Sequence, residues 1–261
     1  MTLKHQALQA AKRLLYGARG EPYTIAGHKL RFVPGTRPTR LKYATTQDWV
    51  ARYDALELGL LAASVRAGDT VFDVGAHTGQ YSVVLAALCG PSGQVVAFEP
   101  DPGARQVLAA NVALNPHVKA PVVEAAAASD RAGEAILFSK GGNAQSSLVR
   151  SGVDYGNLGG VEQVPVRTIT LDGYGLSPQW VKIDTEGAEI AILRGARRLL
   201  ASDTNFLVEL HPYAWPEFGV TFEDLQDIVA RSGRWMRYLD QSEPLTDNPR
   251  YGIVILERDP R

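Results

Sequence analysis

The sequence predicts an α/β fold built on a doubly wound sheet, and three observations support this prediction. From Thr70 onward, short runs of Val, Ile, Leu and Phe alternate with stretches of helical periodicity. These runs are continuously apolar, as strands covered on both faces must be. The first run leads into a glycine loop and then a helix, which is the order found where doubly wound sheets bind their ligands.

Length and composition restrict the class of protein. The chain has 261 residues, 45% hydrophobic and 21% charged, so we expect a globular core and exclude disorder as the dominant state. The single cysteine, Cys89, excludes an internal disulfide framework and a zinc cluster of several thiolates. No stretch approaches the roughly 20 apolar residues of a membrane helix, and no signal-peptide core is recognised. We therefore expect a cytoplasmic protein without membrane partners.

Residues 1–68 are predicted to form an N-terminal cap on a domain of residues 69–261. Apolar spacing predicts a first helix from about Leu3 to Leu15, ended by Gly17 and Gly20. Two short apolar runs around Gly27 predict a hairpin over residues 23–33. A second helix is expected over residues 48–65, with an inner face formed by Trp49, Tyr53, Leu56, Leu60 and Leu61.

The cap is strongly basic. Residues 1–42 carry nine Lys and Arg against one acid, Glu21, so this segment has a net charge of +8 within a chain of net charge -1. Such a segment suits an acidic carrier protein, or it is a solvated face that balances an acidic body. Few aromatic residues accompany the basic ones, so we do not expect nucleic acid as the partner.

Beyond the cap, each apolar run is assigned to a strand and each periodic stretch to a helix. In chain order the elements are a strand at 70–75, a helix near 81–89, a strand at 94–100, a helix near 103–114, strands at 121–129 and 179–187, a helix near 188–200, a strand at 205–212, a helix near 222–232, and strands at 234–240 and 251–258. Residues 131–171 differ, because short apolar runs there are separated by Gly- and Asn-rich turns. They predict a β-rich insertion with a mobile loop at Gly141, Gly142 and Asn143.

The first motif with chemical content follows the strand at 70–75. Gly75 and Gly79 allow backbone amides to approach a ligand at the strand end, and Asp73 can accept hydrogen bonds from an amine-bearing group. The next strand ends in Glu99, Pro100 and Asp101, where an acid can bind both hydroxyls of a ribose. The glycine loop and the acid at the end of the next strand together indicate a nucleoside cofactor.

Glycines that a dinucleotide-binding loop would need are missing here, and this indicates which cofactor to expect. A dinucleotide loop of the form G-x-G-x-x-G places pyrophosphate against bare backbone. Here the three positions are Gly75, His77 and Gln80, so large side chains replace two of the three glycines and disfavour NAD or FAD. No phosphate-loop motif is present. S-adenosylmethionine carries no phosphate and tolerates a D-x-G-x-x-x-G loop.

With these residues the sequence resembles the FkbM-type S-adenosylmethionine-dependent methyltransferases from about Asp69 to Pro212. The matching segments, in order, are DVGAHTGQYS (73–82), VVAFEPDP (95–102), AAASD (126–130), VRTITLD (166–172), VKIDTEGAE (181–189), LRGA (193–196) and VELHP (208–212). The resemblance implies a class I methyltransferase fold, Rossmann-like, with seven strands and an antiparallel final hairpin. It also implies O-methylation of a small molecule such as a polyketide, sugar or related natural product. His77 departs from the family, which more often has Asn there.

The resemblance also assigns cofactor contacts by position. It places the methionine part of S-adenosylmethionine among Asp73, Gly75, Gly79 and Tyr81, with the loop residues Ala76, His77 and Thr78 between them. Glu99 and Pro100 would lie at the ribose, and Ser129 and Asp130 would flank the adenine. Asp184 is a further expected contact to the cofactor. For Gly75 and Gly79 a tight turn alone is the structural alternative, and for Tyr81 it is packing of a helix residue on the sheet.

The second motif lies at the ends of two later strands that are neighbours in the usual strand order. Asp184 ends one strand, while Glu209 and His211 lie on one side of the next because they are two residues apart. A hydroxyl must lose its proton to become a good nucleophile, and His211 suits the general base, oriented by Asp184 or Glu209. Glu186 and Glu189 are read as acids that can cap the following helix.

The same three residues, Asp184, Glu209 and His211, also form a candidate ligand set for Mg²⁺ or Mn²⁺. The reaction expected is methyl transfer from S-adenosylmethionine to a hydroxyl of a small molecule. The alternatives are an NAD-dependent oxidoreductase and a non-catalytic adenosine-cofactor binding protein. A homodimer is a further expectation.

Overall fold

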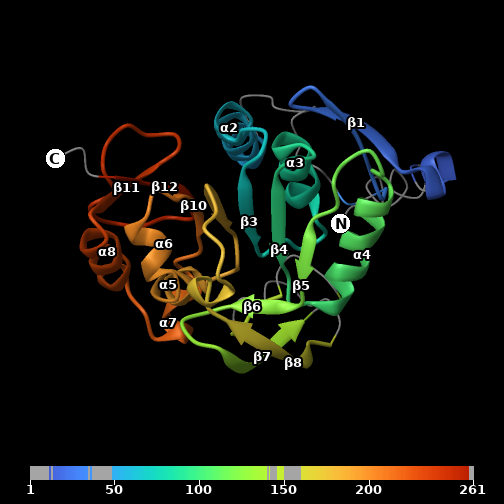
Figure 1. Cartoon of the computed structure of the whole chain (residues 1–261). Helices are drawn as coiled ribbons and strands as arrows, with labels where there is room; N and C mark the ends of the chain where they lie inside the picture. The colour runs from blue at the N-terminus through green and yellow to red at the C-terminus, as the bar shows by residue number, and fades with distance from the viewer. Residues whose placement is uncertain are drawn as a thin grey trace.

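A seven-stranded mixed sheet forms the centre of the computed structural model, which describes residues 12, 14–34, 36, 49–139, 141, 146–149 and 160–258 (Figure 1). Its strands lie in the order β11-β12-β10-β9-β3-β4-β5. Their bounds are β3 Thr70–Val74, β4 Gln94–Phe98, β5 Val122–Glu124, β9 Trp180–Ile183, β10 Asn205–Leu210, β11 Arg234–Tyr238 and β12 Gly252–Arg258. The predicted doubly wound sheet of seven strands is confirmed.

Pairing in this sheet is parallel from β5 to β10 and antiparallel at β12. Strand β3 pairs with β4 on one side and β9 on the other, and β9 pairs in turn with β10. Strand β12 runs antiparallel to both β10 and β11. The carboxyl ends of β3, β4, β9 and β10 therefore meet at one edge, which is where doubly wound sheets bind ligands.

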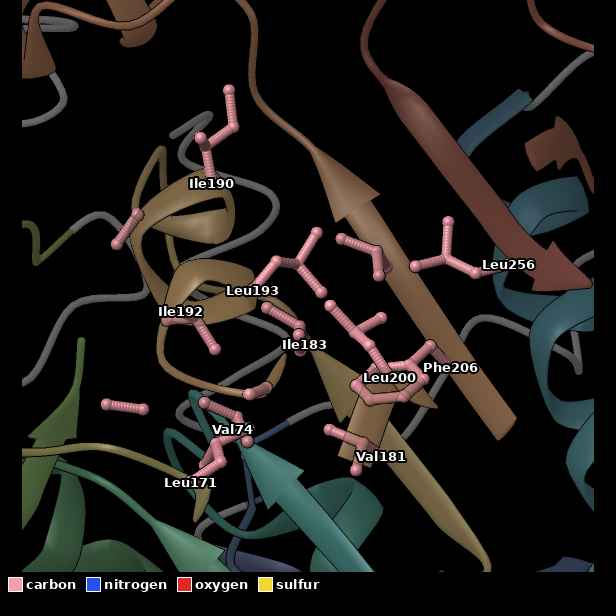
Figure 2. Close-up of a cluster of buried hydrophobic side chains, with 14 of the residues drawn as sticks. Val74, Leu171, Val181, Ile183, Ile190, Ile192, Leu193, Leu200, Phe206 and Leu256 are labelled. Atoms are coloured by element: carbon pink, nitrogen blue, oxygen red, sulfur yellow. The ribbon is translucent and has the colours of Figure 1, made fainter. Parts of the chain in front are cut away.

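Helices cover both faces of the sheet, so both faces are buried. Helices α2 (Trp49–Ser64) and α3 (Gln80–Cys89) pack on the face that carries Val71, Val95 and Leu207. Helices α5 (Glu189–Arg194), α6 (Arg197–Ala201) and α8 (Phe222–Arg231) cover the opposite face, whose core includes the fully buried Phe72, Phe98 and Phe206. Figure 2 shows part of this core around Ile183 and Leu193. Each such side chain contributes about 1.5–3 kcal/mol by leaving water.

Two predicted elements are divided in the structure. The strand expected at 121–129 separates into β5 and β6 (Ala126–Ala128), because β6 leaves the main sheet and pairs with β8 (Glu162–Ile169). The helix expected near 188–200 breaks into α5 and α6 at Gly195. A Cβ atom on Gly195 would overlap the carbonyl oxygen of Ser129, so the break brings the two backbones into close contact.

The predicted insertion forms a second sheet. Strand β7 (Gly133–Ser139) pairs antiparallel with β8, giving the order β6-β8-β7. Backbone hydrogen bonds between Phe138 and Ser147 continue the pairing beyond β7. In Figure 1 this sheet lies below the carboxyl ends of the main strands. Of the loop expected to be mobile, Gly142 and Asn143 lie outside the described residues.

The described part of the cap consists of a hairpin and helix α2. Strands β1 (Glu21–Ile25) and β2 (His28–Phe32) pair around the turn at Ala26 and Gly27, as predicted. On α2, Leu61 is buried as expected, whereas Leu56 and Leu60 are only partly buried and Glu57 and Leu58 are buried instead. Most of the first predicted helix, from about Leu3 to Leu15, lies outside the described residues.

Two asparagines attach the hairpin to the domain. Asn111 belongs to helix α4 (Pro102–Ala113), and Asn115 lies in the turn after it. Asn115 bonds both backbone groups of Arg31, accepting from its N–H at 2.8 Å and donating to its carbonyl at 2.7 Å. Asn111 accepts from the N–H of Val33 at 2.7 Å and donates to the carbonyl of Thr78 at 2.8 Å. Both asparagines are buried. Asn111 thus links the residue after the hairpin to the glycine loop.

Within the described residues, every helix is either too short or too polar to cross a lipid bilayer.

Candidate active site

The glycine loop connects β3 to α3 in a conformation that needs glycine. Gly75 and Gly79 have φ values of +82° and +76°, in the left-handed region. A Cβ atom on Gly79 would lie 2.6 Å from Cγ of Leu108, and one on Gly75 would overlap the carbonyl oxygen of Asp184. The glycines therefore have a packing role as well as leaving the backbone open to a ligand.

Asp73 lies beneath this loop at the end of β3. It is buried, and its Oδ2 accepts a hydrogen bond of 2.5 Å from the Ser82 hydroxyl. Its Oδ1 is buried without a hydrogen-bond partner among the described residues. Burial raises the pKa of Asp73, although the Lys182 ammonium opposes this shift. The orphaned oxygen fits the amine of an amino-acid ligand, which can donate to it.

Glu99 lies at the end of β4, beside the glycine loop. Its two carboxylate oxygens accept backbone hydrogen bonds, from the N–H of His77 at 2.6 Å and from that of Asp101 at 2.7 Å. Burial raises the pKa of Glu99 to about 7, while these two donors act in the opposite direction. The backbone thus fixes the carboxylate at the strand end, where it can bind ribose hydroxyls.

A cavity runs along these strand ends. Of the predicted cofactor residues, it is lined by Gly75, His77, Glu99, Pro100 and Asp184. The insertion and the segment after β9 complete its walls, with Ala127, Ala128, Leu137, Ser146, Ser147, Leu148, Thr185, Glu186 and Ala188.

The other predicted cofactor residues lie elsewhere. Asp73, beneath the loop, is not among the residues that line the cavity, and neither are Ala76, Thr78 and Gly79 within the loop. The Tyr81 ring packs under the Lys182 ammonium, 4.4 Å from its centroid. Ser129 and Asp130 also lie off the cavity wall, with the Ser129 N–H donating to the Ile169 carbonyl. Their contact with adenine stays a prediction.

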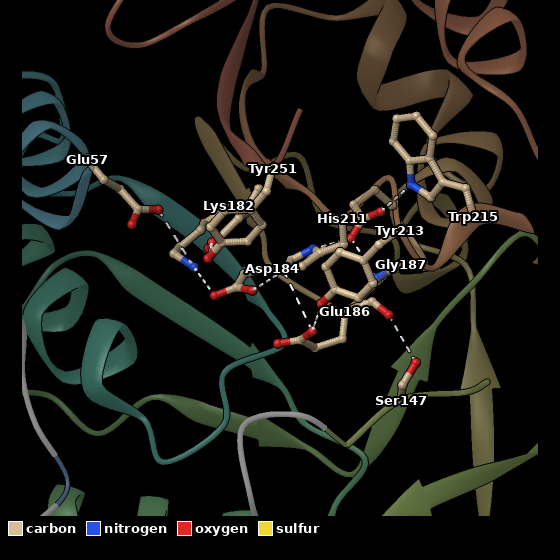
Figure 3. A network of polar contacts seen from close by, with 12 residues as sticks. Glu57, Ser147, Lys182, Asp184, Glu186, Gly187, His211, Tyr213, Trp215 and Tyr251 are labelled. Carbon is tan, nitrogen blue, oxygen red and sulfur yellow. Dashed lines mark hydrogen bonds and ion pairs between the residues drawn. The ribbon is translucent and has the colours of Figure 1, made fainter. Parts of the chain in front are cut away.

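The second predicted cluster comes together at the ends of β9 and β10 (Figure 3). Asp184, Glu209 and His211 each offer one ligand atom, and these atoms lie within 4.8 Å of one another. The His211 Nε2 lies 4.0 Å from Asp184 Oδ1 and 3.9 Å from Glu186 Oε2. Because Asp184 also lines the cavity, the cluster adjoins the predicted cofactor site.

His211 is held in place by a buried carboxylate that the sequence did not assign to it. Its Nδ1 lies 2.8 Å from Glu189 Oε1, while Glu189 also accepts from the Gly187 N–H at 2.8 Å and from the Trp215 indole N–H at 3.0 Å. This arrangement directs Nε2 toward Asp184. Burial lowers the pKa of His211, but Glu189, Glu186 and Asp184 outweigh burial and raise it to about 10.

Lys182 is a second buried basic group of the site. Its ammonium lies 3.3 Å from Asp184 and 3.7 Å from Glu57 of helix α2. Burial lowers the pKa of Lys182, but the charges of Glu57, Asp184 and Asp73 outweigh burial and raise the pKa above its usual value. In return Lys182, followed by His211, lowers the pKa of Asp184 against the effect of burial. Asp184 is therefore an ionised carboxylate at neutral pH.

Two tyrosines flank His211 edge-on, with ring centroids 5.7 Å away for Tyr213 and 5.3 Å for Tyr251. The Tyr213 hydroxyl donates to Glu186 at 2.5 Å, and the Tyr251 hydroxyl donates to Glu209. Burial and the Asp184 charge raise the pKa of Glu209 to about 8. Tyr251 and Glu57 were missed in the sequence, because nothing in their local pattern marks residues that only the tertiary fold brings together.

Comparison of the sequence with known families identifies the domain. A sequence model described as the methyltransferase FkbM domain matches residues 73–238. No curated protein matches the chain significantly. Among solved structures, methyltransferase FkbM from Methylobacillus flagellatus KT is 14% identical, with a TM-score of 0.49 over 81% of this chain and 55% of that one. The present chain thus spans little more than half the length of that protein.

Two further structures have comparable similarity. Precorrin-6y C5,15-methyltransferase from Geobacter metallireducens GS-15 is 15% identical, with a TM-score of 0.46 over 84% of this chain and 96% of that one. A SAM-dependent O-methyltransferase from Thermotoga maritima is 11% identical, with a TM-score of 0.46 over 93% and 78%.

The strand order, the antiparallel β12 and the glycine loop with its two strand-end acids define a class I methyltransferase domain of the S-adenosylmethionine-dependent type. The chain belongs to the FkbM methyltransferase family, whose domain covers residues 73–238.

Proposed function

We propose that the protein transfers a methyl group from S-adenosylmethionine to a hydroxyl group of a small molecule. The observation that carries this proposal is the position of Asp184. Its side chain lines the cofactor cavity and lies 4.0 Å from the His211 Nε2. One residue thus connects the predicted methyl donor with the predicted proton acceptor.

The described residues fit the cofactor. The buried Oδ1 of Asp73, which lacks a hydrogen-bond partner among the described residues, is suited to the ammonium of the methionine part. The Glu99 carboxylate, fixed by the N–H groups of His77 and Asp101, is suited to the ribose hydroxyls. When bound, S-adenosylmethionine supplies an activated methyl group on a positively charged sulfur.

The protein's contribution is alignment and proton removal. The acceptor oxygen forms a bond to the methyl carbon while the carbon–sulfur bond breaks, and the sulfur retains the electron pair. The acceptor's proton passes to Nε2 of His211, which Glu189 orients through Nδ1. For this role His211 must start neutral, although the surrounding acids raise its pKa to about 10. S-adenosylmethionine, when bound, would supply a positive charge that opposes that shift, because like charges disfavour the imidazolium.

A divalent cation is the alternative use of the same cluster. The donors of Asp184, Glu209 and His211, two oxygens and one nitrogen, are of the kinds that Mg²⁺ and Mn²⁺ accept, and Glu189 would then orient a metal-bound imidazole. A bound cation would polarise the acceptor oxygen. Titration of EDTA-treated protein with Mn²⁺, followed by electron paramagnetic resonance, tests this alternative. Binding that Asp184→Asn abolishes would support it.

The central test is calorimetric titration of EDTA-treated protein with S-adenosylhomocysteine and, separately, with NAD. We expect micromolar binding of S-adenosylhomocysteine, weakened by Glu99→Ala. Because Glu99 also accepts two backbone hydrogen bonds, the thermal unfolding of the variant must be measured alongside. A preference for NAD would refute the proposal and favour an oxidoreductase.

A non-catalytic adenosine-cofactor binding protein would bind S-adenosylhomocysteine but show no methyl transfer to any member of a panel of hydroxyl compounds. The natural product, polyketide or sugar character of the acceptor, an acidic carrier as partner of the basic cap, a homodimer and a cytoplasmic location remain proposals.

A further inference from the structure

A second groove, the hairpin groove, lies on the N-terminal hairpin and apart from the cofactor cavity. It is lined by residues 22–24 of β1, by residues 29–31 of β2, and by Leu114, Pro116 and His117 at the end of α4 and in the turn after it. None of these described residues also lines the cofactor cavity. In Figure 1 the hairpin lies at the upper right near α4, whereas the small sheet of the insertion lies at the bottom.

The floor of the hairpin groove is apolar and packed against the core. Leu30 is only 1% exposed. Tyr23 is partly buried, and its ring meets Phe32 edge-on with 6.0 Å between the ring centroids. These three side chains pack in one hydrophobic cluster. Leu114 also contacts the chain that enters β1, because a Cβ atom on Gly20 would lie 2.7 Å from its Cδ1. The floor is therefore a fixed surface of the folded domain.

The rim of the hairpin groove is basic. Lys29, Arg31 and His117 are exposed there, and no Asp or Glu is among the described residues that line the groove. The Arg31 Nη1 donates to the backbone carbonyls of Arg19 at 2.9 Å and Gly20 at 3.1 Å, and these neutral acceptors hold the guanidinium without cancelling its charge. The His117 Nε2 lies 3.0 Å from the Lys29 carbonyl. Three basic side chains thus border one apolar floor.

The surroundings of the groove carry charge of the same sign. Glu21 is the only acid in the hairpin sequence, and it forms an ion pair with Lys12 at 2.6 Å. The whole segment 1–42 has a net charge of +8. A positive surface of this kind attracts acidic partners and repels basic ones. The occupant of the groove must therefore carry negative charge.

The backbone of the hairpin restricts how a partner can bind. Pro22 has no N–H group, so β1 is a poor template for an added strand. On β2, both backbone groups of Arg31 already bond to Asn115. A partner must therefore contact the side chains on the face of the hairpin. A nucleic acid would need open aromatic faces for stacking, whereas Tyr23 is the one aromatic residue that lines the groove and it packs against Phe32. An acidic protein fits better.

We propose that the hairpin groove is a docking surface for an acidic segment of a partner protein. Carboxylates of that segment would pair with Lys29, Arg31 and His117, while its apolar side chains would lie against Tyr23 and Leu114. The inference does not depend on the proposed function, because the groove and the cofactor cavity share no lining residue within the described part of the chain. A partner bound here would leave the cavity open to its own ligand.

The test uses a fluorescein-labelled peptide of glutamates with interspersed leucines, whose anisotropy is followed as the protein is added. We expect binding at 50 mM salt that weakens about tenfold or more at 300 mM. Lys29→Glu should weaken binding about tenfold, because it replaces an attraction by a repulsion. Arg197→Glu is the matched control, since it makes the same change of charge at an exposed position on α6, and it should alter the affinity less than about twofold.

Two further measurements separate the rim from the floor. His117→Glu should also weaken binding about tenfold and provides an independent variant of the rim, with thermal unfolding as the check that each variant is folded. A peptide with serine in place of each leucine keeps its charge but loses its apolar contacts. We expect it to bind about fivefold more weakly.

Several results would overturn the proposal. These are no binding at 50 mM salt, an equal loss in Lys29→Glu and Arg197→Glu, or equal binding of the serine peptide or of a single-stranded oligonucleotide of the same charge. A dimer in sedimentation that Lys29→Glu dissociates would assign the groove to a second copy of the chain. S-adenosylhomocysteine should bind equally well with and without the peptide, and competition between them would place the peptide in the cofactor cavity. Failure of S-adenosylhomocysteine to bind at all would refute the proposed function alone and leave the peptide result standing.

Discussion

The backbone carbonyl oxygen of Asp184 occupies the space that a Cβ atom on Gly75 would need. Strands β3 and β9 are hydrogen-bonded neighbours, and the Asp184 N–H donates to the Val74 carbonyl at 2.9 Å directly before this contact. The close approach brings the first residue of the glycine loop against the residue that connects the cavity with His211. The glycine loop and the predicted catalytic cluster thus meet at one backbone contact.

Substitution of Gly75 by alanine tests this contact. We expect Gly75→Ala to lower the free energy of unfolding by about 3 kcal/mol or more, because the new methyl group meets backbone and the φ value of +82° is unfavourable for alanine. Gly219→Ala is the matched control, since Gly219 has a φ of +63° but nothing within 4 Å of its Cβ position. It should cost only about 1 kcal/mol. Equal losses in urea denaturation would show that φ alone is responsible.

Binding of S-adenosylhomocysteine should depend on pH through Glu99. Burial raises the pKa of this carboxyl to about 7 in the free protein. Ribose hydroxyls donate to the ionised form, so binding below pH 7 must release a proton and becomes weaker as the pH falls. We expect about a tenfold loss in affinity between pH 7.5 and pH 5.5. Calorimetry with Glu99→Gln should show weak binding with a flatter pH profile. An equally steep profile in that variant would assign the effect to another group.

The same pKa shift predicts the sign of a stability effect. The folded chain retains the Glu99 proton to about pH 7, whereas the carboxyl has an ordinary pKa of 4.5 when unfolded. Between these values the folded state binds more protons, so the contribution of Glu99 to stability falls as the pH rises. Denaturation of the wild type and Glu99→Gln over pH 4.5–7 should therefore show a smaller decline in the variant.

Asn111 should be essential for attachment of the hairpin. Its side chain is buried and bonds Val33 and Thr78, so Asn111→Ala leaves two backbone groups without their partner. We expect a loss of about 2–4 kcal/mol in the free energy of unfolding. Asn205→Ala, which removes a bond of 3.1 Å from an exposed asparagine to the Gln179 carbonyl, should cost about 0.5 kcal/mol or less. Similar losses in both variants would mean that the buried bonds contribute little.

Substitution of His77 by asparagine should stabilise the protein slightly. His77 has a φ of +49°, in the left-handed region, where asparagine is favoured among residues with a side chain. His77→Asn is expected to gain about 0.5 kcal/mol, whereas His77→Val should lose more than about 1 kcal/mol because β-branched residues avoid this region. The backbone N–H bond to Glu99 remains in both variants. A destabilised His77→Asn protein would indicate that the imidazole itself makes a stabilising contact.

The sequence alone was sufficient for the main sheet, because each strand is a continuous apolar run and the order of motifs is specific. It was not sufficient where a strand leaves the main sheet or where a helix is interrupted. Ala126–Ala128 continue the apolar run of β5, so their pairing with β8 has no local signal. The break at Gly195 depends on contact with Ser129, which lies in another element.

For the candidate site, too, the sequence predicted residues at strand ends but not the contacts between distant elements. Asp184, Glu209 and His211 were found because strand ends are visible in the sequence, and the structure brings their ligand atoms within 4.8 Å. The sequence did not predict that Glu189 orients His211 or that Lys182 forms an ion pair with Glu57. Each of these contacts joins elements far apart in the chain. Acids near His211 also raise its pKa to about 10, which its ordinary value would not suggest.

The crowding of carboxylates around His211 has a consequence for turnover. Asp184, Glu186 and Glu189 surround a single imidazole, so negative charge predominates beside the cavity. In the proposed reaction, methyl transfer would convert a positively charged sulfur into a neutral one, and an acidic wall attracts the charged form more strongly. The product of the proposed reaction would therefore be attracted less than the methyl donor, and we expect S-adenosylhomocysteine to bind more weakly than S-adenosylmethionine.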